Sequence, residues 1–141
     1  MPKFGNTSRT RLSTCHRDLV RIFNDVVARY DCSVLCGHRP KDLQDQAVAQ
    51  HKSRTPWPGS KHNRMPSLAI DVAPWPIDWD DIGRFYHFAG FVHATTLDLF
   101  ERGEIEHRIR WGGDWNRDGR MTTDPTQKFN DLVHFELFKP Q

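Results

Sequence analysis

Apolar residues recur along the chain at two spacings, and these predict different elements. Between Thr14 and Tyr30 they are three and four residues apart, which is typical of one face of an α-helix. The stripe consists of Leu19, Ile22, Phe23, Val26, Val27 and Tyr30. Ser13 or Thr14 would suit the N-cap of this helix. In contrast, residues 33–36 form a short apolar run ended by Gly37, which predicts a buried strand.

Two further helices are indicated by their starting residues. Pro40 suits the first turn of a helix that runs from Lys41 to about Lys52. Acidic residues at 80 and 81 favour the N-terminus of another helix, which we expect to reach about Arg102 and to bend or split at Gly90. The remaining predicted strands are 68–73, 109–111 and 134–137, and the predicted loops are 55–66 and 114–125.

Helices and strands follow one another without a regular βαβ rhythm, which predicts the α+β class. The 141 residues suit a single small domain, and no linker, repeat or low-complexity tract divides them. Nine glycines and nine prolines favour a loop-rich fold over a helix bundle. We therefore expect one domain over residues 1–141.

Charge and cysteine content narrow the function classes. Twenty basic and 18 acidic residues give a net charge of only +2, so we expect no nucleic-acid partner. The N-terminus lacks the apolar stretch of a signal peptide, and no 18-residue apolar run exists, so we expect no stable membrane association. Three cysteines, an odd number, make a poor disulfide framework, and Cys32 and Cys36 at the ends of an apolar run are expected to be buried free thiols. A metal site from Cys32, Cys36 and His38 would lack a nearby fourth ligand.

Two of the eight histidines stand in a context that suits a metal site. His62 lies in the loop that leads into the apolar strand, and Asp71 lies within that strand. A buried carboxylate is costly unless it is paired or metal-bound, although Asp71 could also serve a turn or a salt bridge. His134 begins another strand, with Asp131 three residues before it. Three such ligands with one open position are typical of catalytic zinc.

At this point the sequence resembles a known superfamily of zinc peptidases. The motifs are Gly37-His38-Arg39 with Gln44, Ser60-Lys61-His62, Ala69-Ile70-Asp71, Trp111 to Trp115, and Asp131 to Leu137. In this order they are similar to the D-alanyl-D-alanine carboxypeptidase and L-alanyl-D-glutamate endopeptidase superfamily, in particular to short phage endolysins. The resemblance implies the hedgehog/DD-peptidase fold, an antiparallel sheet flanked by helices.

The resemblance also implies roles for single residues. His62, Asp71 and His134 match the zinc ligands, Asp131 the general base, and Arg39 the residue that stabilises the oxyanion. Ser60 and Gln44 match positions on the substrate side or just behind it. One departure concerns spacing, since many relatives place the first His and the Asp seven apart, whereas here the gap is nine. The region of residues 65–66 must therefore loop out.

The implied substrate is bacterial peptidoglycan, cut between L-Ala and D-Glu by a monomer without a separate wall-binding domain. Such an enzyme would gather in the host cytoplasm and reach the wall through a separate pore protein. The alternatives are a D-Ala-D-Ala carboxypeptidase or dipeptidase and a non-catalytic domain stabilised by zinc. The second alternative predicts four protein ligands.

Two weaker patterns remain. Asp114, Asn116 and Asp118, followed by Gly119, match the first half of a calcium-binding loop. Position 12 would be Pro125, so the bidentate ligand is missing unless the neighbouring Asp124 replaces it, and an Asx-rich turn without metal is the alternative. The five tryptophans, which would either line a substrate groove or pack in the core and loops, are Trp57, Trp75, Trp79, Trp111 and Trp115.

Overall fold

A four-stranded antiparallel sheet lies at the centre of the molecule, with the strand order β1-β2-β4-β3. The strands are β1 (Cys32–Cys36), β2 (Ala69–Pro74), β3 (Arg108–Gly112) and β4 (Asp131–Phe138). The computed structural model describes residues 1–120 and 130–141. All four strands overlap the runs predicted from the sequence, although β1, β3 and β4 begin earlier than expected.

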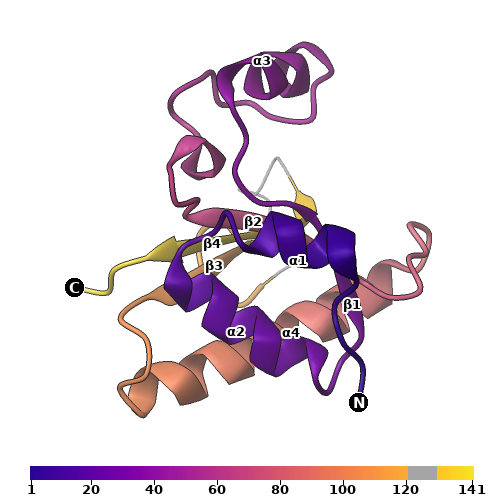
Figure 1. The fold of residues 1–141 in the computed structure, drawn as a ribbon, viewed down its shortest axis with the longest axis vertical. Coiled ribbons are helices and arrows are strands. Elements are labelled where there is room, and N and C mark those ends of the chain that lie inside the picture. The colour runs from indigo at the N-terminus through magenta and orange to yellow at the C-terminus, as the bar shows by residue number, and fades with distance from the viewer. Residues whose placement is uncertain (121–129) are drawn as a thin grey trace.

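Helices cover the sheet and extend beyond it (Figure 1). They are α1 (Asn6–Leu12), α2 (Arg17–Val27), α3 (Lys41–Ala49) and α4 (Ile82–Glu101), with a 3₁₀ turn η1 (Lys61–Asn63). Helix α1 packs against β1, and α2 packs against α4, which in turn contacts the sheet. Helix α3 stands apart at the top of Figure 1, connected to η1 by the loop at residues 50–60. The α+β class and the antiparallel sheet flanked by helices are thus confirmed.

The apolar stripe of α2 forms one side of the core, because its spacing of three and four directs it toward the sheet. Leu19, Ile22, Phe23 and Val26 are all 0% exposed. Phe23 packs edge-on against Phe135 of β4, with ring centroids 5.6 Å apart. No helix in the described part of the chain combines the length and apolarity needed to cross a membrane.

The start of α2 differs from the prediction. Neither Ser13 nor Thr14 is its N-cap, since these two residues follow a separate short helix, α1, which apolar spacing did not indicate. His16 caps α2 instead, with its Nδ1 accepting a hydrogen bond from the backbone N–H of Asp18 at 3.0 Å. The imidazole thus replaces the hydroxyl or carboxylate that usually satisfies such an N–H group.

Helix α4 has the expected length but is more regular than expected. It runs unbroken through Gly90, and a Cβ at this position would meet nothing within 4 Å. Gly90 therefore lies on an open face, and nothing around it forces the helix to bend or split. The side chain of Asp81 caps the helix by accepting from the N–H of Arg84, as its acidic start predicted.

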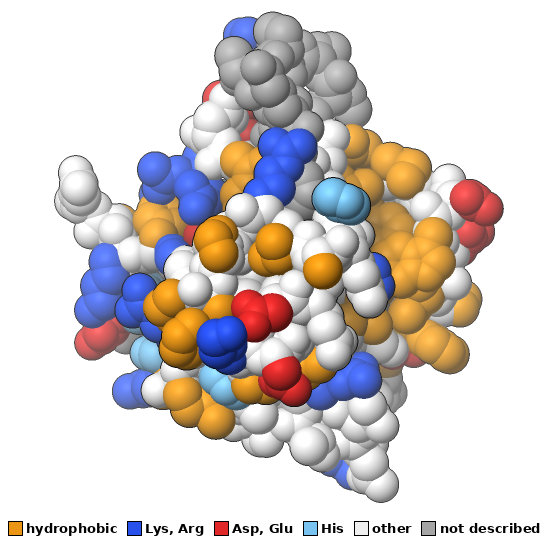
Figure 2. All heavy atoms as spheres, turned by 90° about the horizontal axis from the view of Figure 1, so that it is seen from above, with side chains coloured by type: hydrophobic (Ala, Val, Ile, Leu, Met, Phe, Trp, Pro, Cys, Tyr) orange, Lys and Arg blue, Asp and Glu red, His pale blue; other side chains and the backbone are white. Residues whose placement is uncertain are grey.

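The surface is mixed rather than dominated by one kind of side chain. Seen from the α3 end, Lys and Arg side chains stand on several sides, and hydrophobic ones gather at the right-hand edge (Figure 2). Trp75 and Trp79 are 51% and 59% exposed in the turn before α4, where the ring of Trp79 stacks on Phe85 at 5.6 Å.

Candidate metal centre and active site

The sheet register brings two of the predicted ligands together. Asp71 of β2 is the direct cross-strand partner of His134 of β4. Side chains of directly opposed residues leave the sheet on the same face, only about 5 Å apart at Cβ. Two residues that lie 63 positions apart in the chain therefore become neighbours through antiparallel pairing alone.

The third predicted ligand, His62, comes from η1. Ser60 caps this turn by accepting from the N–H of His62 at 3.2 Å, and the side chain of Asn63 completes a capping box. His62 is 1% exposed, while Met65, further along the same segment, is 69% exposed. The residues that lengthen the gap between His62 and Asp71 thus turn outward to solvent, as the departure in spacing predicted.

His62, Asp71 and His134 form a compact triangle of ligand atoms. His62 Nε2 lies 3.1 Å from Asp71 Oδ1 and 3.2 Å from His134 Nδ1, and His134 Nδ1 lies 3.3 Å from Asp71 Oδ1. Tetrahedral zinc with bonds of about 2.0–2.1 Å holds its ligand atoms about 3.3 Å apart. The triangle therefore fits a divalent cation without rearrangement of the backbone.

Each side chain of the triangle is oriented by a further partner. His62 Nδ1–H donates to the carbonyl oxygen of Gly37 at 2.7 Å, and His134 Nε2–H donates to Glu136 Oε1 at 2.9 Å. Arg39 Nη2–H donates to Asp71 Oδ2 at 3.3 Å. Such partners are typical of metal-binding histidines, because they fix the ring and the tautomer that leaves the other nitrogen for the metal.

Gly37 is required by the close packing around this carbonyl group. A Cβ at residue 37 would lie 2.4 Å from the carbonyl oxygen of Arg11 and 2.4 Å from the hydroxyl of Thr14. Any larger residue would push the 37–38 segment away from these neighbours and displace the partner of His62.

The Asp71 carboxylate and the two imidazoles of the triangle stabilise each other's charged forms. Burial alone would raise the pKa of Asp71, but the neighbouring His62 and His134 hold it well below its usual range. Burial alone would lower the pKa of His62, yet the Asp71 carboxylate raises it to about 10. A cation would take the place of the protons shared here, because imidazole binds metals in its neutral form.

The triangle opens onto a cavity of about 420 Å³. His62, His134, Ser60, Arg39 and Asp131 all line it. The structure therefore brings the predicted ligands, the predicted base and the predicted oxyanion residue to one place. Trp115 lines the cavity as well, with its ring 5.3 Å from that of His134, whereas Trp111 is buried at 4% exposure.

An irregularity in the sheet turns Asp131 toward this cavity. Between Trp111 and Gly112, β3 advances by one residue while its partner on β4 changes from Phe135 to Asp131. The extra residues of β4 bulge out of the ladder, which re-aims the side chain at the strand's start. A Cβ at Gly112 would lie 2.1 Å from the carbonyl oxygen of Asp131, so only glycine allows this approach. Burial and then the Asp71 carboxylate raise the pKa of Asp131.

Gln44 was expected on the substrate side or just behind it, and the structure places it behind. It is 0% exposed and does not line the cavity. Its Oε1 accepts from Arg39 Nη1 at 3.0 Å and from Asn63 Nδ2 at 3.2 Å. Gln44 therefore supports Arg39 and η1, because a fully buried amide has no surface left for a substrate.

Glu136 is a site residue that the sequence analysis missed. It is 6% exposed, and it bridges His134 to Arg110 Nη2 at 2.7 Å and Lys61 Nζ at 3.2 Å. Burial opposes its charge, but His134 and Arg110 lower its pKa to about 2. The signal was present in the sequence, because residues two apart on a strand share a face, and Glu136 follows His134 by two.

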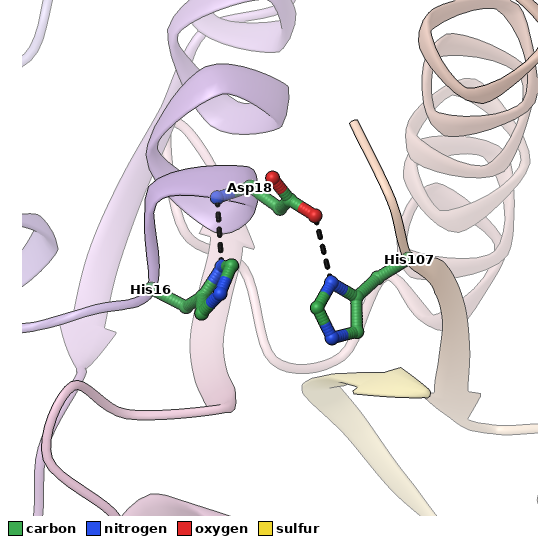
Figure 3. A group of neighbouring side chains, drawn as sticks. All are labelled: His16, Asp18 and His107. Atoms are coloured by element: carbon green, nitrogen blue, oxygen red, sulfur yellow. Dashed lines mark hydrogen bonds and ion pairs between the residues drawn. The ribbon is translucent and has the colours of Figure 1, made fainter. Parts of the chain in front are cut away.

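A second His/Asp group lies at the start of α2 and consists of His16, Asp18 and His107 (Figure 3). His107 Nδ1–H donates to Asp18 Oδ2 at 2.7 Å, and the same oxygen accepts from the N–H of Glu106 at 3.0 Å. Since the Nδ1 of His16 also accepts from Asp18 N–H, both imidazoles are already engaged with Asp18. These contacts are hydrogen bonds that fasten α2 to the segment before β3, so we assign the group a structural role.

The structure gives less support to the remaining predicted sites. In the loop of Asp114, Asn116 and Asp118, the side-chain oxygens accept from backbone N–H groups of the loop, such as Gly119 N–H to Asp114 Oδ2 at 2.9 Å. Nothing supports calcium there, and Asp124 and Pro125 lie outside the described residues. Cys32 is a buried free thiol, as expected, and burial raises its pKa to about 12. Cys36, also expected to be buried, is a free thiol that is only partly buried.

Comparisons with known proteins identify the family and the fold of this chain. The chain is 28% identical over 142 residues to the L-alanyl-D-glutamate peptidase of Escherichia phage T5, which covers 96% of this chain and 97% of the relative. The fold of this chain is similar to that in the crystal structure of the L-Ala D-Glu endopeptidase ChiX of Serratia marcescens. The TM-score is 0.70 at 22% identity, over 96% of this chain and 90% of that chain. The sequence model of the phage L-alanyl-D-glutamate peptidases matches residues 1–138, and the chain therefore belongs to that family.

Proposed function

We propose that this chain is a zinc-dependent peptidase that hydrolyses the bond between L-alanine and D-glutamate in the stem peptides of bacterial peptidoglycan. The observation that carries the proposal is the triangle of His62, Asp71 and His134, which opens onto a cavity that Asp131 also lines. Two imidazoles and one carboxylate with an open side are typical of catalytic zinc, whereas structural zinc is enclosed by four protein ligands. The family membership supports the choice of the scissile bond.

The roles of the residues follow from their positions. Bound zinc would supply the Lewis acidity that activates water and polarises the scissile carbonyl group. Asp131 would accept the proton of the attacking water and pass it to the leaving amine, a role that its raised pKa favours. Arg39 would face the negative charge that develops on the carbonyl oxygen, and its contacts with Asp71 and Gln44 hold it in place.

Digestion of purified peptidoglycan fragments tests this proposal. The zinc-loaded protein should release fragments with a new D-glutamate N-terminus, detected by mass spectrometry, and a chelator should stop the release. Loss of a terminal D-alanine instead would identify a D-Ala-D-Ala carboxypeptidase or dipeptidase. Zinc binding without any cleavage would identify a non-catalytic zinc-stabilised domain.

The resemblance to phage endolysins also supports a route to the substrate. We propose that the enzyme, as a monomer, gathers in the host cytoplasm and reaches the wall through a separately encoded pore protein. Expression in bacteria should leave cells intact until a pore-forming protein is induced, and co-expression should then lyse them. Lysis without the pore protein would contradict this route.

A further inference from the structure

Among the described residues, the cavity beside the metal triangle has an unbalanced charge. Five basic side chains from 1–120 and 130–141 line it against two acidic ones, namely Arg39, Lys52, Arg54, Lys61 and Arg110 against Asp131 and Glu136. Glu136 already pairs with Lys61 and Arg110, and Arg39 pairs with Asp71. Lys52, on the wall formed by residues 52–55, takes no part in these pairs.

Lys52 and Arg54 stand on this wall, in the loop after α3. Both side chains belong to exposed residues that line the cavity. Lys52 forms no salt bridge with any residue in 1–120 or 130–141. An ammonium group at the edge of a cavity is a ready partner for an anionic group of a ligand, because charge-assisted hydrogen bonds are the stronger ones.

The wall is fixed relative to the metal triangle rather than free to move. Gln44 Nε2–H donates to the carbonyl oxygen of Thr55 at 2.6 Å and to Ser53 Oγ at 3.0 Å. The Oε1 of the same amide accepts from Arg39, which contacts Asp71. One buried side chain therefore joins the basic wall to the residue that orients a metal ligand.

The substrate of the proposed function carries a matching charge. D-Glutamate has two carboxyl groups besides the amino group of the scissile bond, and continuing the peptide uses only one of them. The other is a free carboxylate a few bonds from the bond that is cut. We propose, on the basis of the proposed function, that Lys52 and Arg54 form a carboxylate-binding subsite for the D-glutamyl residue.

This subsite would determine both the direction in which the stem peptide binds and the selectivity for its charge. The D-glutamyl side of the stem peptide lies toward residues 52–55, with the scissile carbonyl group at the metal triangle. A stem peptide whose free carboxylate is replaced by a carboxamide keeps its shape but loses the charge. The enzyme should therefore distinguish acidic from amidated stem peptides.

Two synthetic peptides test the subsite, one with the free D-glutamyl carboxylate and one with a carboxamide in its place. For the zinc-loaded protein we expect a kcat/KM roughly tenfold higher on the acidic peptide, mainly through KM. The double variant Lys52→Met, Arg54→Met should bring the ratio of the two kcat/KM values to about one. Lys52→Arg, which keeps the charge, should preserve the preference.

Lys41→Met is the matched control, because Lys41 is an exposed lysine on α3 that does not line the cavity. It should keep the preference of the original protein. Equal cleavage of both peptides by the original protein, or a preference that survives the double variant, would overturn the subsite alone. Cleavage of neither peptide would overturn the proposed function and the subsite with it.

Discussion

Replacing Glu136 by glutamine probes the contact that orients His134. The His134 and Arg110 side chains lower the pKa of Glu136 from 4.5 to about 2, a difference of about 2.5 units. At about 1.4 kcal/mol per unit, this corresponds to about 3 kcal/mol of unfolding free energy at pH 7. Glu136 is 6% exposed, so solvent screens the interaction little.

The pH dependence of this contribution has a definite sign. The pKa of Glu136 is depressed in the folded state, so its contribution is fully present above pH 4.5, the unfolded value, and is lost as the pH falls toward 2. Urea denaturation of the metal-free protein should show the full difference between the original protein and Glu136→Gln at pH 7. About 40% of it should remain at pH 3.

The same substitution should weaken zinc binding by about 10- to 100-fold, because glutamine keeps a hydrogen-bond acceptor for His134 but removes the charge. Competition with a chromophoric chelator measures this affinity. Glu106→Gln is the matched control, since the Glu106 side chain is 80% exposed and its pair with Lys139 should contribute at most about 1 kcal/mol. Equal stability and zinc affinity for the two variants would refute the role assigned to Glu136.

Four further outcomes follow from the site. Asp131→Ala should abolish turnover in the digestion assay while atomic absorption still finds zinc; loss of zinc would make Asp131 a ligand instead. His62→Ala should reduce the zinc content from one per chain to none, whereas His16→Ala should retain it, and two zinc ions per chain would contradict the structural role of the second group. Zinc affinity should rise with pH and binding should release protons, seen by calorimetry in buffers of different ionisation enthalpy, because Asp71 raises the pKa of His62 to about 10. Gly112→Ala should lower activity and stability together, by about 1–3 kcal/mol in unfolding free energy, since its Cβ would collide with the backbone of Asp131; unchanged melting and turnover would count against that collision.

The parts of the fold that follow from local chemistry could be predicted from the sequence. The stripe of α2 is regular because it packs on the sheet, and all its residues from Leu19 to Val27 are buried, while Tyr30 at its end is partly buried. Helix α1 lacks such a stripe, and only Ser8 and Leu12 are buried in it. Long-range contacts with β1 support it, such as Val34 N–H to Ser8 Oγ at 3.1 Å, and these are invisible to periodicity.

In the candidate site, too, some features follow from the local sequence and others depend on long-range contacts. A histidine in a loop, a carboxylate inside an apolar strand and a histidine opening a second strand were sufficient to suggest the triangle. The role of Gln44 as a buried support depends on its contacts with Arg39 and Asn63, and the bulge that aims Asp131 depends on the register of β3 and β4; residue spacing determines neither. Sequence order identified which residues meet, whereas the supporting contacts required three-dimensional packing.

The exposed turn around Met65 has a consequence for recognising distant relatives. In the stretch between the η1 histidine and the β2 carboxylate, Ser67, Ala69 and Ile70 are buried, whereas residues 64–66 are exposed, Met65 by 69%, and are little constrained by packing. Insertions or deletions there would change a loop in water and leave the ligand atoms where they are. A search that demands a fixed number of residues between these two ligands would therefore discard true members, whereas one that requires the β2–β4 cross-strand pair and lets this turn vary would retain them.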